Sequence, residues 1–147
     1  MKNSTRGNVD AFIVMDVMES ARRAESQGRH IIHMEVGQPG TSAPKGALEV
    51  LRGHMQSEPM GYTVALGLPD LRNKIAELYY KWYGISLNPD RVVVTSGSSG
   101  AFLLAFNSIF DSGDRVGIGA PGYPSYRQIL KALGLFPVDI ATTEENR

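Results

Sequence analysis

The residues best suited to chemistry in this sequence form a short stretch rich in glycine and serine, residues 96–100 (SGSSG). The stretch lies between the β-branched run Val92–Val94 and the apolar run 101–110, so we expect it to join a strand to a helix. The amides of residues 98–100 would then point outward at the positive end of the helix, beside the serine hydroxyls. This arrangement predicts a site for an anion such as a phosphate. A plain turn in which a serine caps the helix is the alternative.

Other patterns do not meet the requirements of the sites that they suggest. The spacing G-x-G-x-x-G occurs at residues 117–122, but its first glycine falls inside a predicted strand and prolines follow, which disfavours a dinucleotide site. The phosphate-loop pattern G-x-x-x-x-G-K-[ST] is absent. On an extended chain His30 would face away from His33 and Glu35, so no metal site is expected there.

An alternation of strands and helices is needed to hold the turn at residues 96–100. The spacing of apolar residues predicts helices over residues 9–27, 45–56, 68–83, 101–110 and 125–133, and extended segments over residues 31–36, 91–95, 115–118 and 136–140. The last three extended segments alternate with helices, which is typical of an α/β fold with a mostly parallel sheet. Ligands of such sheets bind beyond the carboxyl ends of the strands, where residues 96–100 are expected.

The composition excludes several classes of protein. With 42% hydrophobic and 20% charged residues among 147, the chain is typical of an ordered protein. Fifteen basic side chains balance fifteen acidic ones, so the chain lacks the basic surplus expected of a protein that binds nucleic acid. No apolar run of about 18 residues is present, and residues 1–10 lack the apolar core of a secretory signal, so we expect no membrane partner. Because there is no cysteine, we expect a cytoplasmic location.

Five blocks of the sequence, taken in order, resemble the class I and II aminotransferases, which are pyridoxal-phosphate-dependent enzymes of fold type I. The blocks are residues 31–40 (IIHMEVGQPG), 61–63 with 67–72 (GYT and GLPDLR), 94–101 (VTSGSSGA), 111–114 (DSGD) and 121–126 (PGYPSY). The resemblance implies a three-layer αβα fold with a mostly parallel sheet. Residues 1–43 would be the N-terminal segment of the small domain, and residues 44–147 the first part of a truncated large domain that binds pyridoxal 5′-phosphate.

The resemblance also implies roles for individual residues toward this cofactor. Gly97, Ser98 and Ser99 match the residues that hold its phosphate, in agreement with the anion site expected at the helix terminus. Tyr123 matches the tyrosine that stacks on the pyridine ring; a loop tyrosine packed on the sheet edge is the alternative. Tyr62 matches the tyrosine that reaches across a homodimer interface to the neighbouring subunit's phosphate, and ordinary turn packing is its alternative.

The implied reaction transfers an amino group between an amino acid and a 2-oxo acid. Gly37 matches the backbone position against the substrate carboxylate; a turn glycine with positive φ is the alternative. In the family, the lysine that forms the Schiff base with the cofactor lies downstream of the matched blocks, and no lysine of this chain falls in its motif. The lysines present are Lys2, Lys45, Lys74, Lys81 and Lys131. We therefore nominate no catalytic residue and expect residues 1–147 alone to be inactive.

Other interpretations stay open. A free-standing α/β module could bind a phosphorylated small molecule or a nucleotide through residues 96–100. A non-catalytic fragment could instead associate through exposed apolar surface. The same N-terminal blocks also occur in fold-type-I enzymes with lyase or decarboxylase chemistry.

Overall fold

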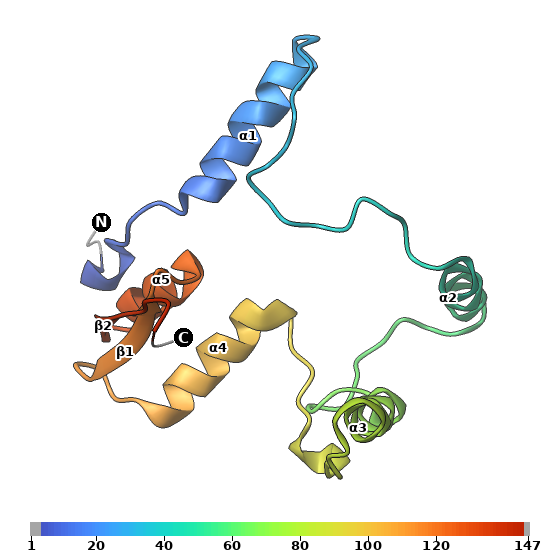
Figure 1. The fold of residues 1–147 in the computed structure, drawn as a ribbon. Helices are drawn as coiled ribbons and strands as arrows, with labels where there is room; N and C mark the ends of the chain where they lie inside the picture. The colour runs from blue at the N-terminus through green and yellow to red at the C-terminus, as the bar shows by residue number, and fades with distance from the viewer. Residues whose placement is uncertain (1–3, 146–147) are drawn as a thin grey trace. The chain divides into compact units, whose positions relative to one another are not determined.

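In the part of the chain that the structure describes, two parallel strands, β1 (Arg115–Ala120) and β2 (Phe136–Ala141), form a sheet (Figure 1). The computed structural model describes residues 4–145. Arg115 lies opposite Phe136, and the register continues to Ala120 opposite Ala141. Helix α5 (Pro124–Ala132) connects the two strands and packs on them, and its Leu130 is fully buried. The β1–α5–β2 segment is therefore the parallel crossover unit that the sequence predicts.

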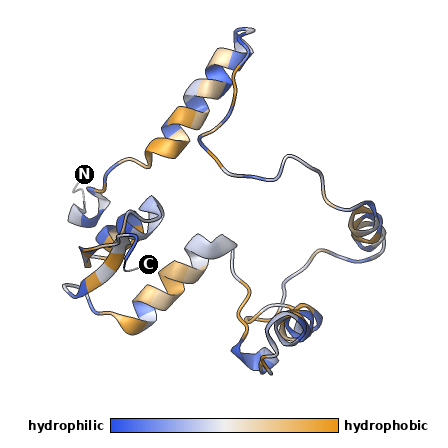
Figure 2. Cartoon of the chain, in the orientation of Figure 1, coloured by the Kyte–Doolittle hydropathy of each residue, from blue (hydrophilic) through white to orange (hydrophobic). Residues whose placement is uncertain are grey.

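Helix α4 (Gly97–Ile109) packs against α5 in the same unit of the structure. Figure 2 shows that much of α4 is hydrophobic. Phe102, Phe106 and Phe110 follow one another with ring centroids 5.6 Å and 6.1 Å apart, because residues four apart lie on the same helical face. This unit contains residues 1–36 and 96–147, including the short helix η1 (Thr5–Gly7) against α5 and helix α1 (Ile13–Ser26).

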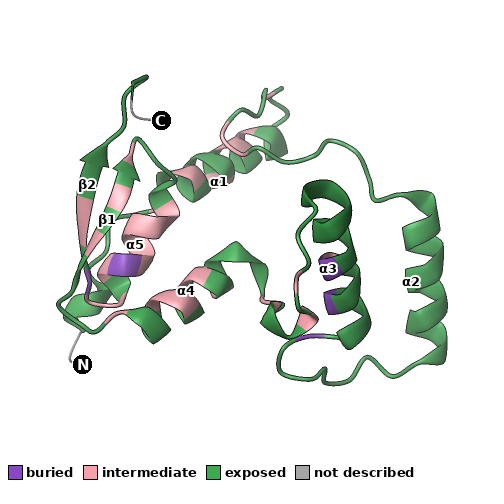
Figure 3. Cartoon of the chain, turned by 60° about the horizontal axis from the view of Figure 1, so that its bottom comes forward, coloured by how far each residue is buried: buried purple, intermediate pink, exposed green. Residues whose placement is uncertain are grey.

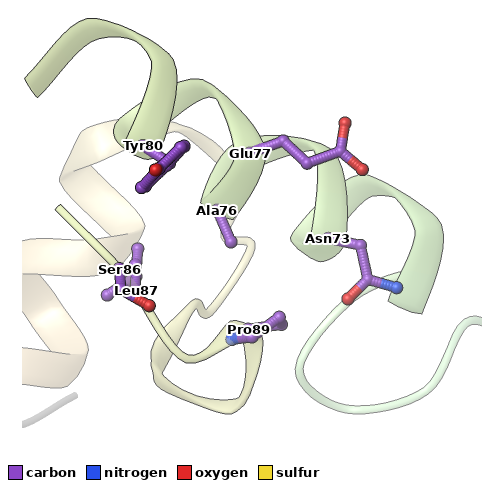
Figure 4. A pocket seen from close by; sticks show the side chains of 7 residues that line it. All are labelled: Asn73, Ala76, Glu77, Tyr80, Ser86, Leu87 and Pro89. Atoms are coloured by element: carbon purple, nitrogen blue, oxygen red, sulfur yellow. The ribbon is translucent and has the colours of Figure 1, made fainter. Parts of the chain in front are cut away.

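The second unit, Gly37–Thr95, contains α2 (Lys45–Ser57), α3 (Pro69–Tyr83) and the short helix η2 (Pro89–Arg91). Arg72 of α3 is 7% exposed and holds η2 in place. Its Nε donates to the Pro89 carbonyl at 3.1 Å, and its Nη2 donates to Asp90 Oδ1 at 2.6 Å. A small pocket remains between α3 and residues 86–89, where Ala76 leaves room beside Tyr80 (Figure 4).

Few side chains in the described residues are buried (Figure 3). The buried apolar ones are Ala76, Leu130 and Leu135. Many larger ones stay open to solvent, such as Leu104 and Ile109 of α4, which are 60% and 69% exposed. Within residues 4–145, no helix has the length and apolar character needed to cross a membrane.

The α/β class and the parallel sheet are confirmed, but the predicted strand over residues 91–95 is wrong. A strand requires a ladder of backbone hydrogen bonds to a neighbour. The Val94 N–H instead makes one bond of 3.0 Å to the Leu66 carbonyl, in a segment without regular structure. The β-branched run therefore indicates extended backbone here but does not supply a pairing partner.

The N-terminal predictions also need correction. Residues 31–36 form no strand, and the helix predicted from Val9 begins at Ile13, because Phe12 has non-helical dihedral angles (φ −84°, ψ 86°). The helices at residues 45–57 and 69–83 agree with the sequence prediction to within one residue at each end.

Candidate functional site

The residues of the predicted anion site lie in the first turn of α4. The helix begins at Gly97, whose φ of +74° is in the left-handed region that glycine adopts without strain. By helix geometry, the amides of Ser98 and Ser99 have no intrahelical acceptor. Gly100 was expected to present its amide as well, but the helix starts earlier than predicted and places this amide opposite the carbonyl of the N-cap residue, Ser96. The outward amides are therefore those of Ser98 and Ser99.

The alternative explanation of this turn, a serine at the N-cap, agrees with the position of Ser96 but not with a capping role for its side chain. The Ser96 side chain makes no capping hydrogen bond to the helix. No acidic residue lies in the first turn, and both Ser98 and Ser99 are exposed. The turn thus presents amides and hydroxyls at the positive end of a 13-residue helix, with no carboxylate in that turn to occupy them.

Tyr123 is joined to this helix by a chain of aromatic rings. It stands at the N-cap of α5 and is 53% exposed. Its ring centroid lies 5.4 Å from that of Tyr126, which lies 4.5 Å from that of Phe102 on α4. Phe12 contacts Tyr123 from another direction, at 6.2 Å and 82°. Tyr123 therefore packs on at least two aromatic rings.

These neighbours of Tyr123 were not identified from the sequence. The spacing of Phe102 and Phe106, four residues apart, could have indicated an aromatic face on α4. No pattern near Phe12 indicates its contact with Tyr123, because the two residues lie near opposite ends of the chain.

The turn that presents Tyr123 depends on a close backbone approach. A Cβ at Gly122 would lie 2.4 Å from the Gly119 carbonyl oxygen, so only glycine fits there. Gly117 and Gly119 belong to β1, and α5 begins at Pro124. The glycines of the G-x-G-x-x-G spacing therefore form a strand and a tight turn, which is not the strand–turn–helix placement of a dinucleotide site.

The remaining predicted residues, Gly37 and Tyr62, belong to the Gly37–Thr95 unit. Gly37 does not have a positive φ, so a left-handed turn does not explain this glycine. Tyr62 lies between α2 and α3 at 108% relative exposure, so the packing expected of a turn residue is not found. Its phenol ring is open to solvent.

His33 forms an ion-pair cluster after α1. Its Nδ1 lies 2.6 Å from Glu35 Oε1, and its Nε2 lies 2.8 Å from Glu25 Oε1. Hydrogen bonds to Glu35 first and Glu25 second raise the pKa of His33 to about 9. Because both ring nitrogens face carboxylates, both donate, and the imidazolium links the end of α1 to the segment that follows it.

Comparison with known proteins shows which family this chain is similar to. Residues 29–147 match the family Aminotransferase class I and II. A valine–pyruvate aminotransferase of Mycobacterium tuberculosis is 43% identical over 142 residues, which are 97% of this chain and 37% of that protein. A (5-formylfuran-3-yl)methyl phosphate transaminase of Methanocaldococcus jannaschii is 37% identical over 95% of this chain and 38% of its own length.

Solved structures agree with the sequence matches. An aminotransferase from Mycobacterium tuberculosis is 41% identical with a TM-score of 0.91, over 99% of this chain and 38% of that one. A provisionally assigned aminotransferase from Silicibacter pomeroyi is 65% identical with a TM-score of 0.84, over 99% of this chain and 37% of that one. The chain thus spans a little over a third of the length of these relatives.

Proposed function

Since this chain belongs to the class I and II aminotransferase family, we propose that it supplies the phosphate site and the ring-stacking tyrosine of a pyridoxal-phosphate-dependent aminotransferase. The complete enzyme would transfer an amino group between an amino acid and a 2-oxo acid. The observation that carries the proposal is the first turn of α4, where Gly97 has a positive φ and no side chain of Ser96 caps the helix.

The residues present fit pyridoxal 5′-phosphate. Its phosphate is a dianion, which suits the amides and hydroxyls of Ser98 and Ser99 at the positive end of α4. Its pyridine ring is flat and aromatic, which suits the half-exposed ring of Tyr123. When bound, this cofactor supplies an aldehyde and an electron-accepting ring, and the chain's own residues anchor and orient it.

Two further roles extend this proposal. The exposed ring of Tyr62 is available to contact the phosphate site of a second subunit in a homodimer. The backbone of Gly37 would lie against the substrate carboxylate. We further propose residues 1–43 as part of the small domain and residues 44–147 as part of the large one, in a cytoplasmic enzyme of amino acid metabolism that binds neither nucleic acid nor membranes.

We also infer that residues 1–147 alone do not catalyse the reaction. Among the described lysines, only Lys131 belongs to the unit that contains α4, and its Nζ donates to Asp10 Oδ2 at 2.5 Å. Lys74 is paired with Glu77 in the other unit. Borohydride treatment in the presence of the cofactor tests this inference, since a specifically labelled lysine would contradict it.

The test of cofactor binding is a titration of the chain with pyridoxal 5′-phosphate, followed by the melting temperature. A ligand that binds only the native state at 100 times its dissociation constant stabilises by about 2.7 kcal/mol. We expect pyridoxal without its phosphate to give a much smaller shift. We also expect Gly97→Ala to weaken binding, since alanine is strained at this φ. A shift with nucleotides but not with pyridoxal 5′-phosphate would favour the free-standing nucleotide-binding module.

A further inference from the structure

The ring of Tyr123 is contacted by two other aromatic rings that come from different parts of the chain. Tyr126 follows it in α5 and meets it at 73°. Phe12 precedes α1 and meets it at 82°, with 6.2 Å between centroids. Edge-to-face contacts of this kind are directional, so they restrict the tilt of a ring as well as its position. Phe12 is the ring that does not share the local backbone of Tyr123.

An ion pair and a helix contact hold the segment that contains Phe12. Asp10 and Lys131 are 121 residues apart in sequence, and their side chains form a hydrogen bond of 2.5 Å. The hydrogen bond and charge of Lys131 lower the pKa of Asp10, and the charge of Arg127 acts in the same direction. The short helix η1 contacts α5 as well. Residues 4–12, which we call the N-terminal strap, thus contact α5, and Phe12 at the end of the strap meets Tyr123.

We propose that Phe12 is a positioning residue for Tyr123, and that the N-terminal strap sets the orientation in which this tyrosine meets the pyridine ring of the cofactor. The inference rests on the proposed function, because it assumes that Tyr123 stacks on pyridoxal 5′-phosphate. About half of the Tyr123 side chain is exposed, so its ring is not fixed by burial. Its orientation depends on the rings beside it, and removal of the Phe12 ring leaves Tyr126 as the partner that α5 itself provides.

The expected effect follows from the strength of one aromatic contact. Such a pair contributes about two- to tenfold in an equilibrium constant. Phe12→Leu removes the ring and keeps an apolar side chain, so we expect about two- to tenfold weaker binding of pyridoxal 5′-phosphate and a changed circular dichroism band of the bound cofactor. Phe12→Tyr keeps the ring and should restore both. Asp10→Asn weakens the strap at an exposed position and should change both measurements in the same direction as Phe12→Leu, by a smaller amount.

Phe110→Leu is the matched control, because it is the same type of substitution at a ring that contacts Phe106, at the far end of the aromatic series. In the ligand-free protein, we expect the ring resonances of Tyr123 to shift in Phe12→Leu and not in Phe110→Leu. The proposed function stands if the wild-type chain binds pyridoxal 5′-phosphate and Tyr123→Ala weakens that binding. If, in that case, Phe12→Leu and Asp10→Asn both behave like Phe110→Leu, the role of Phe12 is refuted. Failure of the wild-type chain to bind the cofactor would overturn both.

Discussion

Gly67→Ala is the substitution for which the structure gives the sharpest prediction. Gly67 has a φ of +98°, and a Cβ built on it would lie 2.6 Å from both Cβ and Cγ2 of Val94. The adjacent Leu66 carbonyl accepts the hydrogen bond from the Val94 N–H. Alanine at this position therefore strains its own backbone and pushes against the segment that leads into the first turn of α4.

The two costs can be separated with a second glycine. A left-handed backbone costs an L-residue about 1–2 kcal/mol, and overpacking costs about 1–3 kcal/mol, so Gly67→Ala should destabilise by about 2–5 kcal/mol in total. Gly84 has a φ of +69°, and a Cβ added there would meet nothing within 4 Å, so Gly84→Ala should cost the backbone term alone. The difference between the two variants isolates the contact with Val94.

Urea unfolding of both variants and hydrogen exchange at the Val94 amide measure this difference. We expect exchange at Val94 to be faster in Gly67→Ala than in Gly84→Ala by roughly 5- to 150-fold, the equivalent of about 1–3 kcal/mol. Val94→Ala removes Cγ2 but not Cβ, so it should rescue Gly67→Ala in part. Equal destabilisation by the two glycine substitutions, with unchanged exchange at Val94, would show that the close approach does not hold this segment.

Three further predictions concern charged and exposed side chains. NMR titration of His33 should give a midpoint near pH 9, and Glu35→Gln should lower that midpoint. Because the pKa of His33 is raised, its ion pairs with Glu35 and Glu25 stabilise the fold fully below pH 6.5 and lose this effect as the pH rises toward 9. Tyr62→Ala should leave the free energy of unfolding within about 0.5 kcal/mol of wild type, because the ring is fully exposed. If Tyr62 has the proposed role in a homodimer, the same substitution should weaken cofactor retention. Arg72→Met should loosen η2, seen as faster hydrogen exchange in that helix, because it removes two donors from a buried position.

The sequence predicts the elements of this fold better than it predicts their pairing. Helix α3 has a clear apolar stripe and recognisable ends at Pro69 and Gly84, so its limits were found almost to the residue, and the weaker pattern of α2 was placed equally well. The run Val92–Val94 has the composition of a buried strand, yet strand formation depends on a neighbour that composition does not reveal. The His33 cluster shows the same limit, since its partner Glu25 lies on the preceding helix.

In the candidate site, too, local features can be predicted from the sequence and contacts between distant residues cannot. A helix terminus beside residues 96–100 could be predicted because it depends on local backbone, and the binding of an anion there stays a prediction. The contact between Phe12 and Tyr123 could not be predicted, because the two rings come from opposite ends of the chain and no local pattern connects them. Resemblance to a family adds roles to single residues, but it does not indicate which distant side chains hold them in place.

The chemistry of the first turn of α4 also follows from what its sequence lacks. Residues 96–110 contain no charged side chain, so attraction for a phosphate would come from backbone amides, hydroxyls and the helix dipole. Neutral donors fixed by a helix act in set directions, whereas a lysine ammonium acts as a mobile point charge. A site of this kind favours a ligand whose phosphate must stay in one position, which is the requirement of a cofactor that is anchored by its phosphate while it reacts at another group.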